Sequence, residues 1–362
     1  MDTYGSDLKA SLIDALKNAE EKLAARAFKA VIMHDFSLDR LVRLDNLDAF
    51  IDSARDIHSR KGGIYPHSYQ SNQQGGCAAN TATTLGRLGV DTRFICRTDE
   101  LGLALIDFYL HKKAGVNIDH VKLGGRLADS TALEIGDERI NIMINDGDSF
   151  TPFGFDDLEE RDFEAIQHCD LVGMFDWCMN RKGTDLASRL LDYMQGRGIP
   201  TYYDTSDPAP RCGEMPELME KAVAHPALNF MNVNENELHQ YACRKMVDQA
   251  TWENIQETAR ILKDGIHANL CVHTSRFAAM LDAQGETVVP AFKVNPLRTT
   301  GAGDNWNAGN ILGILLGLET AQRLLLANAV AANYITSPNC ERPTLTELIN
   351  FLEDPNLELK QI

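Results

Sequence analysis

The C-terminal third of the chain carries the run Arg298-Thr299-Thr300-Gly301-Ala302-Gly303-Asp304, followed by an apolar stretch at 311–316. A glycine-rich turn before a helix presents backbone N–H groups that have no partner within the helix, and the helix dipole adds positive potential. The run therefore predicts an anion site at the start of a buried helix. Asp304 in such a site suits a general base that takes a proton from a hydroxyl while the N–H groups hold a phosphoryl group. A tight turn with Asp304 as the helix N-cap is the alternative.

The composition indicates a soluble globular protein. The chain has 362 residues, 44% of them hydrophobic, and a formal net charge of −17. This length is sufficient for one large α/β domain, and the negative charge disfavours binding to nucleic acid or to an anionic membrane surface. The eight cysteines include no C-x-x-C pair, as expected of reduced thiols in the cytoplasm. No signal peptide or membrane-spanning run is recognisable, so we expect a cytoplasmic protein.

Strands alternate with helices over most of the chain. Leucines recur at helical spacing within residues 6–27, where no glycine or proline occurs. We interpret residues 1–28 as an N-terminal helical extension, packed on the body or on another subunit of a homodimer, and residues 29–362 as one domain. Beyond Pro152, four strands alternate with four helices, which predicts a mainly parallel sheet with helices on both faces. The expected strands are 170–173, 201–203, 230–233 and 268–272, and the helices are 183–196, 214–223, 234–246 and 250–264.

Two stretches do not fit this alternation. Residues 39–72 and 118–148 are rich in strand and loop patterns and contain no expected helix. We interpret them as a small separate sheet that can cover a site on the main body.

Polar residues follow several of the expected strands. Asp39 follows the first strand, Asp204 follows the strand at 201–203, and Asn234 and Glu237 follow the next one. In a parallel sheet, ligands collect beyond the carboxyl ends of the strands. Asn234 and Glu237 are one helical turn apart, so their oxygen atoms could hold a hydrated Mg²⁺. A capping box is the alternative, and on spacing alone it is favoured.

A second glycine motif is the run Gly75-Gly76-Cys77-Ala78-Ala79-Asn80. Its small residues let a ligand approach the backbone, and the Asn80 amide can both donate to and accept from a hydroxyl. A helix N-terminus with glycine for packing is the alternative. The segment 327–332, which includes Asn328, also carries small residues. They suit either close packing on the helix that contains Gly309 or a slot for adenine.

Together these motifs resemble those of the ribokinase-like (PfkB) carbohydrate kinases, over roughly residues 30–355. The resemblance implies a three-layer αβα fold with a mainly parallel central sheet and a small β-sheet lid, here built from 39–72 and 118–148. The matching residues are Gly75, Gly76 and Asn80 for the G-G-x-x-x-N pattern, Gly301 to Asp304 for G-A-G-D, and Asn234 and Glu237 for N-x-x-E.

The resemblance also implies transfer of the γ-phosphoryl group of ATP, with Mg²⁺, to a hydroxyl of a sugar or sugar-like alcohol. The alternatives are a nucleoside kinase of the same fold and a non-catalytic ligand-binding or regulatory member. Asp304 is then the general base, and the backbone of Gly301, Ala302 and Gly303 is the anion hole. The other implied site residues are Asp39, Gly75, Gly76 and Asn80 for the acceptor, and Asn234 and Glu237 for Mg²⁺ and phosphates.

Departures from the family pattern bear on the chemistry. Arg298 stands where relatives often have an aspartate that helps to hold a monovalent cation. We expect its guanidinium to replace that cation, so that K⁺ is not required. His34-Asp35 adds bulk and charge close to Asp39, which indicates an unusual acceptor.

A further departure concerns the nucleotide. The segment 273–278 lacks the glycines that such kinases have before the nucleotide loop. Thr274, Arg276 and Asn328 are our candidates for nucleotide contacts.

Overall fold

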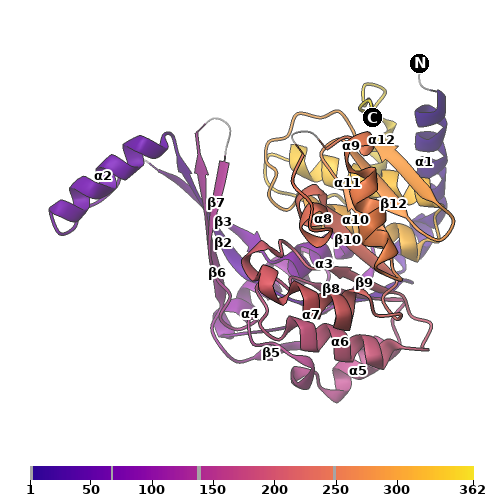
Figure 1. Cartoon of the computed structure of the whole chain (residues 1–362), viewed down its shortest axis with the longest axis horizontal. Helices are drawn as coiled ribbons and strands as arrows, with labels where there is room; N and C mark the ends of the chain where they lie inside the picture. The colour runs from indigo at the N-terminus through magenta and orange to yellow at the C-terminus, as the bar shows by residue number, and fades with distance from the viewer. Residues whose placement is uncertain (1–2, 67, 137–139, 248–249) are drawn as a thin grey trace.

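The computed structural model describes residues 3–66, 68–136, 140–247 and 250–362. It contains a nine-stranded sheet within a helical body and a separate four-stranded sheet that extends from one side of that body (Figure 1). The predicted architecture, a mainly parallel sheet with a small second sheet, is therefore confirmed. No helix in these ranges is long and apolar enough to cross a membrane.

The large sheet is parallel except at one edge, where β12 and β13 run antiparallel. Its interior strands are apolar on both faces, as in β8, because helices cover the sheet on both sides. The strands, in spatial order, are β13 (Glu286–Pro290), β12 (Phe277–Leu281), β11 (Asn269–His273), β10 (Phe230–Asn234), β9 (Thr201–Asp204), β8 (Leu171–Phe175), β1 (Lys29–His34), β4 (Asp91–Thr98) and β5 (Val121–Leu123).

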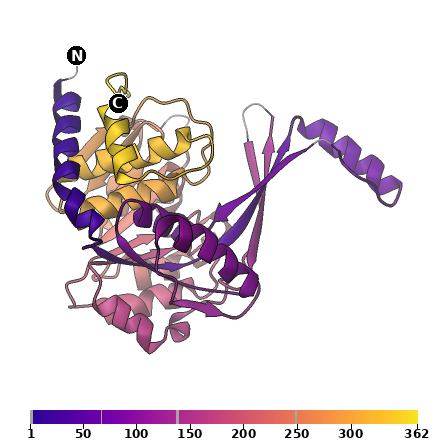
Figure 2. The same ribbon diagram turned by 180° about the vertical axis from the view of Figure 1, so that it is seen from behind.

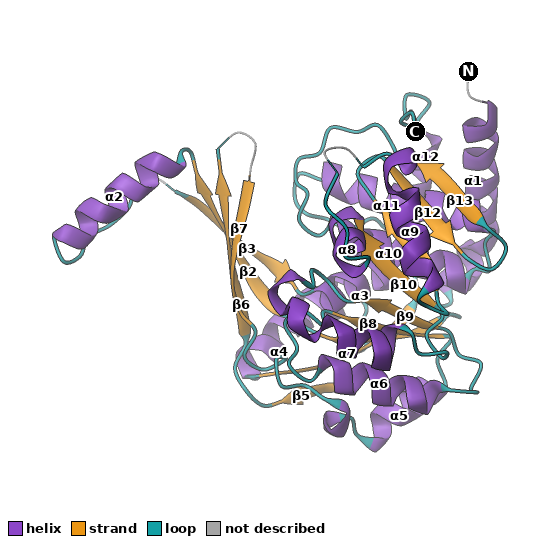
Figure 3. Cartoon of the chain, viewed as in Figure 1, coloured by secondary structure: helices purple, strands orange, loops and turns teal. Residues whose placement is uncertain are grey.

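Two helical layers and two apolar cores enclose this sheet (Figure 3). The first layer comprises α1 (Thr3–Ala24), α3 (Cys77–Arg87), α4 (Glu100–Ile106) with its continuation η1 (Asp107–Lys112), α10 (Ala302–Leu315), α11 (Thr320–Thr336) and α12 (Leu345–Glu353). The second comprises α5 (Glu160–Gln167), α6 (Gly183–Met194), α7 (Met215–Leu218) with η4 (Met219–Val223), α8 (Glu235–Tyr241) and α9 (Trp252–Asp264). Short 3₁₀ turns are η2 (Phe155–Asp157) and η3 (Ala209–Glu214).

Helix α1 packs on the body of its own chain. It contacts α11 and α12, and Leu12, Leu16 and Leu23 are buried in the first core. The structure therefore shows the packing of this helix on the body, which is one of the two arrangements that the sequence predicts.

The small sheet has the order β3 (Tyr69–Gly75), β2 (Ser37–Leu44), β6 (Ala128–Ile135), β7 (Ile140–Asp146). Strand β2 begins three residues after β1 ends, and β3 ends two residues before α3 begins. Ser37 pairs with Gly75 at the end of the sheet nearest the body. Strands β6 and β7 are joined to the body at this same end, where Ala128 pairs with Ser37 and Asp129 pairs with Asp146. The sheet is thus attached to the body at one end only, which suits a lid.

Two details of the lid differ from prediction. Residues 39–72 contain a helix, α2 (Leu47–Ser59), so the expectation of strands and loops alone is wrong there. Asn46 caps this helix, and its apolar residues recur at helical spacing, a signal that was present in the sequence. Helix α2 buries none of its residues and projects from the tip of the lid, away from the body (Figures 1 and 2). In addition, β5 pairs with β4 in the large sheet, so only the later part of 118–148 belongs to the lid.

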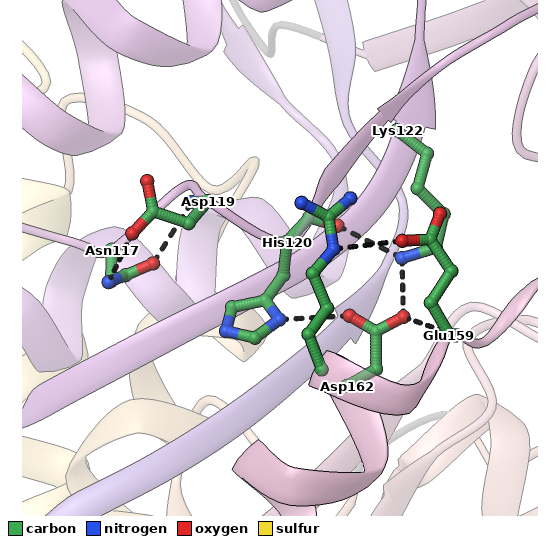
Figure 4. Close-up of polar contacts among 7 residues, drawn as sticks. Asn117, Asp119, His120, Lys122, Glu159 and Asp162 are labelled. Atoms are coloured by element: carbon green, nitrogen blue, oxygen red, sulfur yellow. Dashed lines mark hydrogen bonds and ion pairs between the residues drawn. The ribbon is translucent and has the colours of Figure 1, made fainter.

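A buried polar cluster fastens the β5 edge to α5 (Figure 4). Asp162 is fully buried, and its carboxylate contacts Lys122 Nζ at 2.5 Å and His120 Nδ1 at 2.9 Å. The same carboxylate accepts the backbone N–H of Glu159 at 2.8 Å. This cluster stabilises the second helical layer and lies outside the cavity described next.

Candidate active site

The carboxyl ends of five neighbouring strands meet the base of the lid at a cavity of about 590 Å³, here called the central cavity. One polar residue at or just after each strand end lines it, as expected for a parallel sheet. In the order of the strands these residues are Asp35 (β1), Asp176 (β8), Asp204 (β9), Asn234 (β10) and His273 (β11).

The glycine run before α10 reaches this cavity. Gly301 is the N-cap of α10 and has φ 81°, in the left-handed region that favours glycine. Gly301, Gly303 and Asp304 line the cavity, so the start of the helix faces it. Ala302 does not line it, and its backbone N–H donates to the carbonyl of Thr299 at 3.1 Å. The structure thus brings together Gly301 and Gly303, but not Ala302, of the predicted anion hole.

Asp304 is held by the second glycine motif. The side-chain nitrogen of Asn80, on α3, donates to a carboxylate oxygen of Asp304 at 2.8 Å. Burial raises the pKa of Asp304 to about 7; the Asn80 hydrogen bond lowers it, and the negative charges of Asp204 and Asp35 raise it. A carboxylate with such a pKa is suited to accept a proton at neutral pH.

The sequence predicts that Asn80 binds the acceptor, and Asn80 does line the central cavity. Both of its polar atoms also have partners within the chain. Its oxygen accepts hydrogen bonds from the guanidinium of Arg342 and from Gln74 Nε2. These contacts position the Asp304 carboxylate, and acceptor binding by Asn80 stays a prediction. Arg342 was not among the predicted residues; it lies 262 residues from Asn80 in a loop without a motif.

The other predicted acceptor residues lie at the base of the lid. Asp39 and Gly76 line the central cavity. Gly75 does not, but a Cβ at this position would be 1.9 Å from Asp39 Oδ1, so glycine is required for Asp39 to fit. Burial raises the pKa of Asp39 to about 6, against the lowering effect of a hydrogen bond from Ser37.

Several carboxylates of the cavity were not among the predicted site residues, and two of them, Asp35 and Asp176, lie side by side on neighbouring strand ends. Asp35 accepts the N–H groups of Cys77 and Ala78 at the start of α3, at 2.5 and 2.9 Å. Asp176 follows β8 and is 6% exposed. Burial and the charge of Asp35 raise the pKa of Asp176 well above its usual range. Their places just after strand ends were the only sequence signal.

Asn234 and Glu237 form the capping box that their spacing favours, and both also line the cavity. The Glu237 carboxylate accepts the backbone N–H of Asn234 at 2.9 Å and its amide at 2.7 Å. Burial, followed by the nearby charge of Asp204, raises the pKa of Glu237 well above its usual range.

These residues fit a hydrated Mg²⁺. No three histidine, cysteine or acidic side chains in the described ranges are grouped to enclose a metal ion. The carboxylates of Glu237, Asp204 and Asp207 nevertheless line one part of the cavity without a neighbouring basic side chain in its lining. Such a site suits Mg²⁺, which keeps several waters and takes few protein ligands.

The structure does not bring the predicted nucleotide residues to the cavity. Thr274 and Arg276 form the turn between β11 and β12, where Thr274 Oγ1 accepts the backbone N–H of Arg276 at 3.0 Å. Asn328 is buried beneath β13, where it accepts from Trp306 Nε1 at 2.8 Å and donates to the carbonyl of Pro290 at 3.1 Å. The small residues around Asn328 therefore serve close packing, since a Cβ on Gly309 would be 2.7 Å from Ala327 Cα.

His273 lines the cavity instead. Its Nε2 would be 3.2 Å from a Cβ on Gly303, and its ring stacks on Trp306 with centroids 5.1 Å apart. Burial lowers the pKa of His273 to about 4, so the ring is neutral near pH 7.

Comparison with known proteins supports this architecture. The solved ribokinase of Arabidopsis thaliana, complexed with ribose and ATP, superposes with a TM-score of 0.69 at 19% identity, covering 90% of this chain and 98% of that one. A 5-dehydro-2-deoxygluconokinase from Geobacillus thermodenitrificans is 24% identical over 305 residues, covering 77% of this chain and 84% of the relative. A ribokinase from Bacillus subtilis is 23% identical over 286 residues, covering 77% and 87%.

The family model that matches this sequence spans most of the chain. It is described as the pfkB family carbohydrate kinase and covers residues 48–347, from the lid to the first turn of α12. The cavity, its glycine-rich helix starts and the lid all lie in or next to this range. The chain belongs to the pfkB family of carbohydrate kinases.

Proposed function

We propose that the enzyme transfers the γ-phosphoryl group of ATP to a hydroxyl of a sugar or sugar-like alcohol, with Asp304 as the general base. The observation that carries this proposal is the arrangement around Asp304. Its carboxylate lies at the start of α10, beside Gly301 and Gly303, and Asn80 fixes its orientation. Its pKa of about 7 matches proton transfer at neutral pH.

In the proposed reaction, Asp304 accepts the proton of the acceptor hydroxyl as that oxygen forms its bond to phosphorus. The bond between the γ-phosphorus and the bridging oxygen breaks, and ADP leaves. The N–H group of Gly303 and the positive end of the α10 dipole stabilise negative charge on the transferred group. Asp39 and Gly76 bind the acceptor at the base of the lid.

Asn234 and Glu237 are the residues that would hold Mg²⁺, through its waters. When bound, this ion supplies neutralisation of phosphate charge. Closure of the lid over the cavity excludes water and so limits hydrolysis of ATP.

Arg298 supports a reaction that does not require K⁺. Its guanidinium donates to the carbonyls of Ser337 and Pro338, at 2.8 and 3.0 Å, near the start of α10. Main-chain carbonyls that accept from a fixed guanidinium are not free to bind a monovalent cation. Turnover measured in K⁺ and in tetramethylammonium at equal ionic strength tests this; a large loss without K⁺ contradicts it.

A nucleoside acceptor and a non-catalytic role are the alternatives, and one assay separates them from the proposal. ADP release is measured across a panel of sugars, polyols and nucleosides. Release with a sugar or polyol supports the proposal, and release only with nucleosides supports a nucleoside kinase. Binding of a panel member without any ADP release supports the non-catalytic role.

A cytoplasmic homodimer stays a prediction. Helix α2 offers it a surface, because its apolar residues have no buried contact within the described chain. Sedimentation of the wild type and of a variant with α2 replaced by a short turn tests this assembly; an unchanged mass contradicts a dimer built through α2.

A further inference from the structure

The central cavity has an unusual charge. Among the described residues that line it, eight are acidic and none is lysine or arginine. His273 is neutral, because burial lowers its pKa to about 4. The acidic residues are Asp35, Asp39, Asp146, Asp176, Asp204, Asp207, Glu237 and Asp304.

Only some of these charges are accounted for by Mg²⁺, by proton exchange or by an ion pair. Asp204, Asp207 and Glu237 lie near Asn234, where Mg²⁺ would balance them. Asp304 exchanges a proton during catalysis. Asp146 pairs with Arg126 at 2.6 Å. Asp35, Asp39 and Asp176 remain, and the described lining of the cavity provides no cation for them.

Of these three carboxylates, Asp176 accepts the longest and weakest hydrogen bond. Asp35 accepts two backbone N–H groups from the start of α3, and Asp39 accepts the hydroxyl of Ser37 at 2.8 Å. Asp176 accepts only the N–H of Met179, at the long distance of 3.4 Å, and its other carboxylate oxygen has no hydrogen-bond partner in the described part of the chain. Asp176 is nevertheless buried, with only 6% of its surface exposed, and it lines the cavity.

Burying a carboxylate with few hydrogen bonds, such as that of Asp176, is costly, and a positively charged ligand can offset that cost. Burial raises the pKa of Asp35 to about 6 and that of Asp176 well above its usual range, the latter also because of the charge of Asp35. An ammonium group beside the two would stabilise their ionised forms. A carboxylate or phosphate on the acceptor would instead meet further negative charge.

We propose that the acceptor is an amine-bearing sugar or polyol whose ammonium group binds beside Asp176 and Asp35, and that anionic acceptors are excluded. This inference rests on the proposed phosphoryl transfer. It separates this enzyme from the Geobacillus relative, whose name denotes a kinase of a gluconate derivative.

Matched acceptors test the proposal on the wild-type enzyme. Each set shares one skeleton (hexose, pentose or alditol) and differs at one position, which carries a hydroxyl, a primary amine, an N-acetylated amine or a carboxylate. Turnover is followed by ADP release, and binding by calorimetry. In the set with the highest turnover, we expect kcat/KM for the amine to exceed that for the matched hydroxyl compound by about tenfold or more, as one desolvated charge pair allows. N-acetylation should remove this advantage, and the carboxylate should be the poorest acceptor.

A variant localises the effect. Asp176→Asn should reduce the ratio of kcat/KM for amine over hydroxyl by about tenfold. Asp185→Asn is the matched control, since Asp185 lies on α6, outside the cavity, and pairs with Arg189 at the surface. It should leave the ratio unchanged.

The outcomes separate the two proposals. A hydroxyl twin that equals or exceeds its amine, or an efficiently phosphorylated carboxylate, overturns the inference while the kinase reaction stands. Tighter binding of amines without any ADP release supports the ammonium site beside Asp176 and Asp35 but contradicts phosphoryl transfer. If no set shows tighter binding of its amine, the inference fails. Should Asp176→Asn not fold, the wild-type ratios decide.

Discussion

Asn80 and Asp304 lie 224 residues apart in the sequence, yet the Asn80 amide donates to the Asp304 carboxylate across 2.8 Å. This contact joins the helix starts of α3 and α10 at one point of the central cavity. It links the orientation and the proton affinity of the proposed base to a residue on the other glycine motif. Several tests follow from this contact and from its surroundings.

Replacing Asp304 tests the base directly. Asp304→Asn keeps the size of the side chain but removes the proton acceptor, so turnover should fall by about 10²-fold or more. ADP release under saturating substrates measures it. Asp185→Asn, at the surface of α6, should retain wild-type turnover. Near-normal turnover of Asp304→Asn would remove Asp304 from this role.

Removing the Asn80 contact should change the pH profile. The Asn80 hydrogen bond lowers the pKa of Asp304, which burial sets at about 7. In Asn80→Ala this pKa rises, less carboxylate is ionised at neutral pH, and the acid limb of kcat/KM moves to higher pH. Turnover at pH 7 should also fall, by about tenfold, because the base is less well oriented. Asn356→Ala, at an exposed turn, is the control. An unshifted acid limb would show that Asn80 does not govern the base.

Gly75→Ala should weaken acceptor binding. The added Cβ would be 1.9 Å from Asp39 Oδ1 and must displace that carboxylate. We expect the KM for the acceptor to rise by about tenfold, while the KM for ATP stays nearly constant, because a displacement of about 1 Å can weaken a site strongly. Gly213→Ala is the matched control, since nothing lies within 4 Å of a Cβ there. Equal changes in both KM values would contradict a role confined to the acceptor.

The cluster around Asp162 should govern stability and not catalysis. Asp162→Ala leaves Lys122 buried without its partner, so the free energy of unfolding should fall by about 3–5 kcal/mol. Asp156→Ala removes the exposed pair with Arg189 and should lower the free energy of unfolding much less, because water screens exposed ion pairs. Urea denaturation measures both, and similar losses would contradict the importance of burial.

The same cluster has a defined pH dependence. Burial raises the pKa of Asp162, but hydrogen bonds from His120, Glu159 and Lys122 outweigh it and hold the pKa below the usual 3.8. A lowered carboxyl pKa contributes stability above the unfolded value, and that stability is lost as pH falls through the folded value. The wild type should therefore lose more stability than Asp162→Ala on acidification below about pH 4, as followed by urea denaturation.

The sequence predicted the parts of this site that depend on local backbone geometry. Gly301 and Gly76 have positive φ and precede helices. Glycine at these two positions of the sequence therefore indicates where the backbone can approach a ligand. Asp176 and Arg342 carry no such pattern. They reach the site only because β8 lies between β1 and β9 and because the loop after α11 folds back onto α3, which is tertiary information.

Other predictions depended on patterns that suit two structures. Asn328 lies in a run of small residues that suits an adenine slot and helix packing equally well. The close approach of Gly309 to Ala327 shows the packing, and the nucleotide contact stays a prediction. Helix α2 was missed for another reason. Its apolar residues are at helical spacing, but the surrounding glycines and strand-like segments favoured a loop interpretation.

The attachment of the lid at one end of its sheet has a mechanical consequence. Because all four of its strands join the body at the end that carries Asp39, a rotation of the lid would turn about a line beside the central cavity. Helix α2 lies at the opposite end of that sheet, so it acts as the long arm of a lever whose short arm carries Asp39. A small force on α2 would therefore act as a larger force at Asp39, so a partner that holds α2 would resist movement of Asp39.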